Sequence, residues 1–198
     1  MTPPEAAAAD LADRIAALPA ARTLTALVGP PASGKSTLAE ALVAALPGAA
    51  LVPMDGFHLD DRVLAARGLS HAKGAPETFD LGGLARLLAA VRAGEEVVAP
   101  VFDRAREIAV AGALVVPASA RHVVVEGNWL LLDRPGWRDL GPWDLTVRLD
   151  VPEPELRRRL RARWRGRPDA EAWIEGNDLP NARTMAADSR QADVVLRG

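Results

Sequence analysis

Buried-strand and amphipathic-helix patterns alternate along this chain. Short apolar runs rich in β-branched residues predict strands at 23–28, 49–53, 97–101, 108–116, 121–126 and 145–149, with a last short one in ADVVL near the C-terminus. Apolar residues at helical spacing predict helices at 5–18, 38–46, 81–93, 153–166 and 169–188, with Asp80 as an N-cap. The two strands at 97–101 and 108–116 are expected to form a hairpin. Strands alternating with helices predict an α/β fold whose mostly parallel sheet is covered on both faces.

The length and composition fit one globular domain. The chain has 198 residues, of which 49% are hydrophobic and 25% charged, which excludes wholesale disorder. No repeat or linker divides it, so one domain is expected over 1–198, with an N-terminal helix within 1–20. The absence of cysteine excludes a disulfide scaffold and a thiol nucleophile. A formal net charge of −2 argues against a general nucleic-acid-binding protein.

No segment is expected to enter or cross a membrane. The longest uncharged apolar stretch, 41–54, is interrupted by Pro47 and Gly48 and is shorter than the roughly 20 residues of a membrane span. The first ten residues, MTPPEAAAAD, are acidic and lack the basic region of a signal peptide. A cytoplasmic protein is therefore expected.

The segment GPPASGKST matches the phosphate-binding pattern G-x-x-x-x-G-K-[ST]. Its glycines let backbone N–H groups turn toward phosphate oxygens, Lys35 reaches the β- and γ-phosphates, and the Ser36 hydroxyl binds Mg²⁺. The pattern lies between a buried strand and a helix, which is the context it requires. The candidate nucleotide-binding residues are Gly29, Ala32, Ser33, Gly34, Lys35, Ser36 and Thr37. The guanine-reading Asn-Lys-x-Asp motif is absent, so a GTP switch is not expected.

Two carboxylates are predicted beside this loop. Asp55 follows the second strand and Glu126 ends the strand VVVE. Ligands of parallel α/β sheets bind at the carboxyl ends of strands, so both side chains are expected to face the phosphates. Asp55 could orient an acceptor hydroxyl and accept its proton, whereas Glu126 could hold Mg²⁺. The alternatives are a turn residue for Asp55 and a purely structural role for Glu126.

The segment LRRRLRARWRGR at 156–167 is dense in arginine. Leu156, Leu160 and Trp164 form a buried stripe, and Arg159, Arg163 and Arg167 run alongside it. These three arginines could belong to a lid, over about 153–168, that brings positive charge to a transferring phosphoryl group. A solvated basic face and a nucleic-acid patch are the alternatives.

With these residues in view, the chain resembles the phosphoribulokinase, uridine kinase and pantothenate kinase group of P-loop kinases. The resemblance covers roughly Arg22 to the C-terminus. It rests on GPPASGKST, MDGFHLDD, KGAPETFD, PVFDRARE, VVVEGNWLLLD, RLRARW, NDLPNA and the terminal AD. Within the group the chain looks most like the small uridine-kinase-like branch, whose members carry names such as nucleoside/nucleotide kinase or fructose-transport-system kinase.

The resemblance implies a P-loop NTPase fold: a three-layer α/β/α domain with a five-stranded parallel sheet and a helical lid. It implies ATP and Mg²⁺ as cofactors, with catalytic roles for Asp55, Lys35 and Arg163. Arg159, Arg163 and Arg167 match nucleotide-binding lid arginines, and Ser36 and Glu126 match metal positions. The implied acceptor-binding residues are Asp55, His58, Lys73, Asp103, Arg104 and Glu126. One departure is Phe102, where both uridine and pantothenate kinases usually have a tyrosine; this chain has none.

The function expected from these features is transfer of the γ-phosphoryl group of ATP to a hydroxyl of a small metabolite. A nucleoside, a sugar and a pantothenate-like alcohol all remain open as acceptors. The alternative is a P-loop ATPase or regulatory NTPase that acts with a partner protein. A nucleic-acid end kinase is the weakest alternative, and no nucleic-acid partner is expected. The N-terminal helix leaves a homodimer open.

Overall fold

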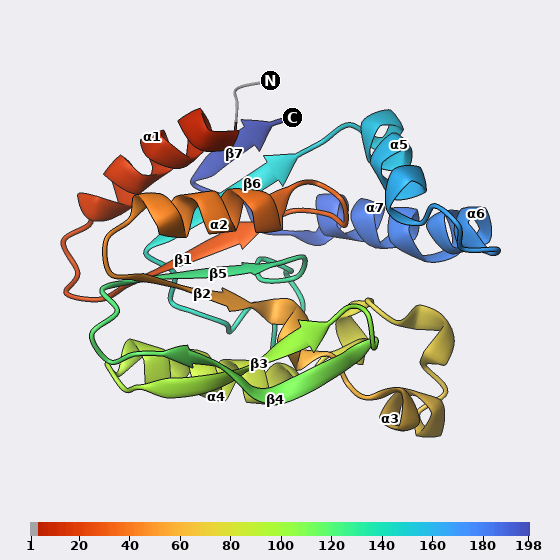
Figure 1. Cartoon of the computed structure of the whole chain (residues 1–198), viewed down its shortest axis with the longest axis horizontal. Coiled ribbons are helices and arrows are strands. Elements are labelled where there is room, and N and C mark those ends of the chain that lie inside the picture. Colours follow the sequence, from red (N-terminus) through yellow and green to blue (C-terminus); the bar gives the residue numbers. More distant parts are fainter. Residues whose placement is uncertain (1–3) are drawn as a thin grey trace.

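A five-stranded parallel sheet organises the protein (Figure 1). The computed structural model describes residues 4–198. The strand order is β2-β5-β1-β6-β7. The strands are β1 Thr23–Val28, β2 Ala49–Pro53, β5 His122–Gly127, β6 Leu145–Asp150 and β7 Val194–Arg197. The sequence-based prediction of a mostly parallel α/β sheet is therefore confirmed.

The central strands β1 and β5 are buried along their whole length. They pair in parallel, with Thr25 beside Val124 and Val28 beside Gly127. A parallel sheet with helices on both faces buries both sides of its inner strands, which explains their near-continuous apolar sequences. As a result, the loop after β1 and the end of β5 emerge side by side at one edge of the sheet.

Helices cover the two faces of the sheet. α1 (Pro4–Ala16) and α2 (Lys35–Ala45) lie above it in Figure 1, and α4 (Leu81–Arg92) lies below. Leu11 and Leu42 belong to the upper core, whereas Leu84 and Trp129 belong to the lower one. Asp80 caps α4 as predicted, because its carboxylate accepts a hydrogen bond from the N–H of Gly83. Together these layers form the expected α/β/α arrangement.

A separate antiparallel hairpin, β3 (Val97–Asp103) and β4 (Ile108–Val116), packs beside the turn that follows β2. That turn, Met54–Phe57, is a 3-10 helix. A Cβ atom on Gly56 would lie 2.2 Å from the carbonyl oxygen of Pro100, so only glycine allows this close approach. The turn and hairpin are thus fixed against each other. Shorter helices follow at α3 (Asp61–Ala66), Ser70–Ala72 and Pro76–Thr78.

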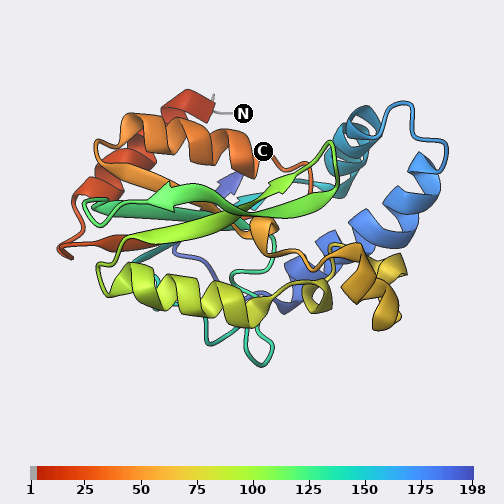
Figure 2. The same cartoon turned by 60° about the horizontal axis from the view of Figure 1, so that its bottom comes forward.

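The last helical region lies beyond the carboxyl ends of the strands and arches over that edge in Figure 2. α5 spans Glu153–Arg163, and α6 is a single turn, Ala170–Trp173. A π-helical segment, Ile174–Asp178, joins α6 to α7 (Leu179–Asp188). The sequence predicted a helix over about 169–188, and the chain is helical over 170–188, but the π-helical segment within it was not predicted. Pro180 has no N–H to donate to the carbonyl four residues earlier, which favours the wider turn.

The ends of the predicted N-terminal element differ slightly from the prediction. The helix predicted over 5–18 is α1, which ends at Ala16. Residues 1–3 of the expected domain lie outside the described residues. Within 4–198, no helix has the length and hydropathy needed to cross a membrane.

Candidate active site

The predicted phosphate-binding loop lies between β1 and α2 at the carboxyl edge of the sheet. Its backbone turns sharply, because Gly34 has φ 94° and Ala32 has φ 61°. The N–H of Ser33 donates to the carbonyl of Pro30 over 3.1 Å, which closes the turn. Lys35 is the first residue of α2 and is only 7% exposed. The loop therefore directs the N-terminus of an eleven-residue helix toward an incoming anion.

Ser36 and Glu126, the two residues predicted to hold magnesium, meet beside this loop. The Ser36 hydroxyl donates to Oε1 of Glu126 over 3.3 Å. The other carboxylate oxygen of Glu126, Oε2, is buried and has no hydrogen-bond partner among the described residues. Burial raises the pKa of Glu126, although the positive charge of Lys35 opposes this shift. An unpartnered buried oxygen beside a hydroxyl is a donor pair that suits Mg²⁺, so these residues fit the ion.

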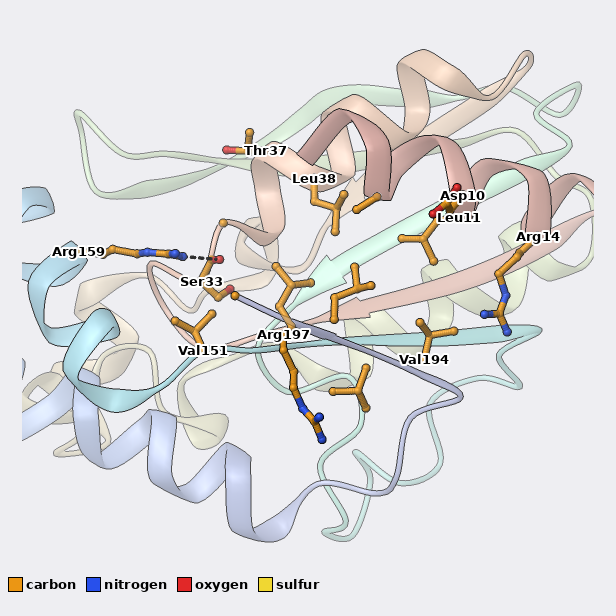
Figure 3. Close-up of a pocket in the computed structure, with 16 residues that line it drawn as sticks. Asp10, Leu11, Arg14, Ser33, Thr37, Leu38, Val151, Arg159, Val194 and Arg197 are labelled. Carbon is orange, nitrogen blue, oxygen red and sulfur yellow. Dashed lines mark hydrogen bonds between the residues drawn. The ribbon is translucent and has the colours of Figure 1, made fainter. Parts of the chain in front are cut away.

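A first cavity, of about 480 Å³, begins at the helix end of the phosphate-binding loop (Figure 3). Its floor is mostly apolar, with Leu11, Leu38 and Val194 among the lining side chains. Polar side chains of α1, Asp10 and Arg14, form its far wall. Such an apolar slot beside a phosphate-binding loop is suited to a flat heterocycle.

Arg159 connects this first cavity to α5. Its Nη1 donates to the carbonyl of Ser33 over 3.0 Å, the contact drawn as a dashed line in Figure 3. Its Nε donates to Glu155 over 2.6 Å. The predicted nucleotide-binding arginine thus touches the loop backbone directly.

A second cavity, of about 680 Å³, opens on the other side of Lys35. The loop after β2, the hairpin and the α5–α7 region all contribute to it. Predicted site residues meet here from these separate segments: Lys35, Asp55, His58, Lys73, Arg104, Arg163 and Arg167. Glu126 lines neither cavity and lies behind Ser36.

Asp55 is the carboxylate that faces this second cavity. Its side chain is 14% exposed, and its Oδ2 accepts a hydrogen bond from Nη2 of Arg104 over 2.6 Å. Burial pushes the pKa of Asp55 upward, but the positive charges around it outweigh this and leave the pKa below its usual value. Those charges are on Lys35, on His58 when its ring is protonated, and on Arg104 and Arg163. Asp55 is therefore ionised at neutral pH.

His58 forms part of the wall next to Asp55. Its Nδ1 donates to the carbonyl oxygen of Asp55 over 2.8 Å. Its ring lies between Phe79 and Phe102, with centroids 4.1 and 4.8 Å away. Burial lowers the pKa of His58, although Asp55 opposes that shift. The ring is therefore a neutral, aromatic surface of the cavity at neutral pH.

Lys73 and Asp103, both expected to bind an acceptor, are held by the protein itself. Lys73 donates to Asp61 over 2.8 Å and to the carbonyl of Glu107 over 3.0 Å, although it does line the cavity. Asp103 does not line the second cavity; its Oδ1 accepts bonds from the N–H groups of Ala105 and Arg106. Its carboxylate therefore stabilises the hairpin turn.

The two remaining arginines enter the second cavity from the end of α5. The guanidinium of Arg167 pairs with Asp169 and lies 4.5 Å from the ring centroid of Trp173. Arg163 stacks on Trp164 at 5.2 Å. Burial, and then the charge of Arg104, lower the pKa of Arg163. Arg163 is thus a desolvated cation on the same cavity as Asp55.

Sequence reasoning missed several lining residues. Trp164 was placed in a buried stripe, yet both it and Trp173 line the second cavity, and Trp164 donates from Nε1 to Asp178 over 2.7 Å. The other missed residues are Asp61, Glu107, Asn128, Asn177, Asp178 and Asn181. Asn177, Asp178 and Asn181 belong to the motif NDLPNA, which supports the family resemblance but has no pattern that indicates a binding site. By contrast, Trp129 is fully buried in the core, where its Nε1 donates to the carbonyl of Gly74.

A phosphate-binding loop on a central parallel strand, with a carboxylate at the end of the neighbouring strand, defines a P-loop nucleotide-binding protein. Comparison with known proteins agrees: the model of the AAA domain family matches residues 26–179. The chain belongs to this family.

The chain has relatives of similar length, and some of them bear kinase names. The uncharacterized protein YggC of Escherichia coli K12 is 39% identical over 189 residues, covering 90% of this chain and 78% of that protein. A candidate uridine kinase of Schizosaccharomyces pombe is 36% identical over 199 residues, covering 89% and 83%. The crystal structure of a candidate fructose transport system kinase from Silicibacter sp. TM1040 has a TM-score of 0.89 at 46% identity, covering 99% of this chain and 100% of that one. The resemblance to uridine-kinase-like P-loop kinases is thereby confirmed.

Proposed function

We propose that this protein is a kinase that transfers the γ-phosphoryl group of ATP to a hydroxyl of a small metabolite. The observation that carries the proposal is that Lys35 of the phosphate-binding loop and the ionised Asp55 line one cavity. A P-loop lysine faces the β- and γ-phosphates, so a carboxylate across the same space is placed to meet an acceptor hydroxyl. The kinase names of the relatives support the same class of reaction.

The two cavities divide the substrates between them. The apolar first cavity, between α1, α2 and β7, takes the nucleoside of the donor, with the phosphates running along the loop toward Lys35. The second cavity takes the acceptor. Arg159 lines the first cavity and Arg163 lines the second. Helix α5 carries both arginines, so it lies beside the path of the phosphoryl group from donor to acceptor.

The chemical step needs no covalent enzyme intermediate. Asp55 accepts a hydrogen bond from the acceptor hydroxyl and takes its proton as the hydroxyl oxygen bonds to the γ-phosphorus. The bond between that phosphorus and the bridging oxygen breaks, and ADP keeps the electron pair. Lys35 and Arg163 stabilise the negative charge spread over the transferring oxygens.

Ser36 and Glu126 would hold the magnesium ion. Bound there, Mg²⁺ would neutralise charge on the donor phosphates. This assignment rests on the buried Glu126 oxygen without a partner.

The experiment is to measure ADP release from Mg·ATP with a panel of nucleosides, sugars, pantothenate and related alcohols. Wild type is compared with Asp55→Asn, and with Asp13→Asn as a matched control on the exposed side of α1. Stimulation by a compound, lost in the Asp55 variant and kept in the control, would support the kinase. ADP release that no compound changes would instead favour an ATPase that acts with a partner.

A further inference from the structure

The proposed base of the reaction is covered by a basic side chain. Arg104 Nη2 lies 2.6 Å from Asp55 Oδ2, and among residues 4–198 this is the only hydrogen bond of that guanidinium. Arg104 is 51% exposed, whereas Asp55 is 14% exposed. Arg104 lies just past the end of β3, so it reaches Asp55 from the hairpin. Nη2 occupies one lone pair of Oδ2 and places a positive charge against the carboxylate, so an acceptor hydroxyl has to compete with Arg104 for this oxygen.

Two of the other cations that line the second cavity, Lys73 and Arg167, are held by protein carboxylates. Lys73 contacts Asp61 and Glu107, and Arg167 pairs with Asp169. A guanidinium has five N–H donors, and Arg104 uses one of them on Asp55. Arg104 therefore has both the free donors and the exposure to receive an anion from solvent.

Arg163 adds a second positive charge to the same space. After burial, the charge of Arg104 is the next cause that lowers the pKa of Arg163, so the two guanidinium groups repel each other, although Asp178, Asp55 and Glu107 oppose this shift. In the proposed reaction Arg163 faces the phosphoryl group arriving along the loop. An anion bound at Arg104 would weaken the repulsion between these two guanidinium groups.

An unpartnered amide gives a further indication. Asn128 is 9% exposed and lines the cavity, and its Oδ1 is buried without a hydrogen-bond partner among the described residues. Buried polar atoms in proteins are normally hydrogen-bonded. A ligand that brings a hydrogen-bond donor, such as a second hydroxyl, would satisfy this oxygen.

We propose that the acceptor is a hydroxylated anion, and that its carboxylate or phosphate takes Arg104 away from Asp55. This inference rests on the proposed kinase function and names its substrate class. Binding of the anion gives the guanidinium a new partner, so the acceptor hydroxyl no longer competes with Arg104 for Oδ2. When no acceptor is bound, the positive charge of the same arginine makes Asp55 a weaker base toward water, which slows hydrolysis of ATP.

The test compares wild type with Arg104→Gln, Arg104→Lys and Arg106→Gln. Arg106 is an exposed arginine on the same turn that lines neither cavity, so it is the charge-matched control. Acceptors are offered in pairs that differ in charge: hydroxy acids with their amides, and sugar phosphates with their sugars. The two pairs separate a carboxylate source from a phosphate source. ATP hydrolysis without acceptor is measured in parallel.

Wild type should phosphorylate the charged member of a pair. Loss of a charge-assisted hydrogen bond in Arg104→Gln should raise its KM roughly 10- to 100-fold. Arg104→Lys should recover part of that loss, and Arg106→Gln should match wild type. Without acceptor, Arg104→Gln should hydrolyse ATP faster, and adding Asp55→Asn should remove the increase.

Efficient transfer to the neutral member, with Arg104→Gln unchanged in KM and in hydrolysis, would overturn the inference and leave the kinase intact. A different result would count against the kinase itself: no transfer to any compound, together with hydrolysis that Asp55→Asn does not alter.

Discussion

The donor and acceptor sides of the site are built in different ways. The donor side uses backbone amides and a helix N-terminus within nine consecutive residues, Gly29–Thr37, anchored between a buried strand and a long helix. The acceptor side uses charged side chains from the loop after β2, the hairpin and the π-helical segment. Many of those charges already pair with each other, as Lys73 does with Asp61. The first side is therefore preformed, whereas the second has to exchange internal partners for its substrate.

The largest difference between the donor and acceptor sides is expected when Lys35→Ala is compared with Asp55→Asn. Lys35→Ala should weaken ATP binding, because it removes a cation that faces the phosphates. Asp55→Asn should bind ATP nearly as wild type does, yet transfer the phosphoryl group about 10²- to 10⁴-fold more slowly. Nucleotide titration and steady-state turnover measure the two effects. Equal loss of ATP binding in both variants would contradict the division.

Gly56→Ala should damage the acceptor side through its packing. The new Cβ would lie 2.2 Å from the carbonyl oxygen of Pro100, so the turn carrying Asp55 and the hairpin must separate. A loss of about 1–3 kcal/mol in unfolding free energy is expected, as for other overpacked sites, together with a higher acceptor KM. Denaturant unfolding measures the loss in unfolding free energy. Gly176→Ala, whose Cβ would meet nothing within 4 Å, is the control and should show neither effect.

Glu126→Gln, on the donor side, should weaken the response of activity to Mg²⁺ without lowering the thermal stability of the protein. The Mg²⁺ concentration that gives half-maximal activity should rise several-fold, because a neutral amide is a weaker ligand for the ion. Thermal unfolding without Mg²⁺ should occur at the same or a higher temperature, since burial disfavours the charged carboxylate. The exposed Glu40→Gln on α2 is the control. A clear fall in melting temperature would show that Glu126 is structural.

The smallest effect expected concerns pH and lies at the opposite end of the sheet. Burial lowers the pKa of His122, whose Nδ1 lies 2.9 Å from the Thr23 hydroxyl. The neutral ring favours the folded state, so its contribution is complete above the unfolded pKa of about 6.5 and declines as pH falls toward the lower folded value. The slope is at most about 1.4 kcal/mol per pH unit for this one group. Unfolding of wild type and His122→Gln between pH 7.5 and 5 measures the difference; identical slopes would refute it.

The difference between the two sides also explains what could be predicted from sequence. The phosphate-binding loop is local, so its pattern and its flanking elements were enough. Asp55 and Glu126 were placed by the rule that parallel strands end at one edge. Helical spacing selected Arg159, Arg163 and Arg167 from a dense run, and all three border a cavity.

The acceptor side was less predictable because distant segments assemble it. Nothing local in the sequence indicates that Lys73 is held by Asp61 and Glu107, or that Asp103 turns back onto its own hairpin. The π-helical segment depends on how Pro180 interrupts hydrogen bonding. Asn177 and Asp178 belong to this π-helical segment, and both line the cavity.

The indoles of Trp164 and Trp173 pack edge to face on the wall of the second cavity, with 6.5 Å between their ring centroids. Two intrinsic fluorophores therefore lie in contact with the proposed acceptor site. The chain has no tyrosine, so its near-ultraviolet emission comes almost entirely from tryptophan. Because Trp164 also donates to Asp178 and stacks with Arg163 and Arg167, a ligand that displaces either arginine alters the polarity around a fluorophore. Occupancy of the acceptor cavity is therefore readable as a change in intrinsic fluorescence, with no label attached.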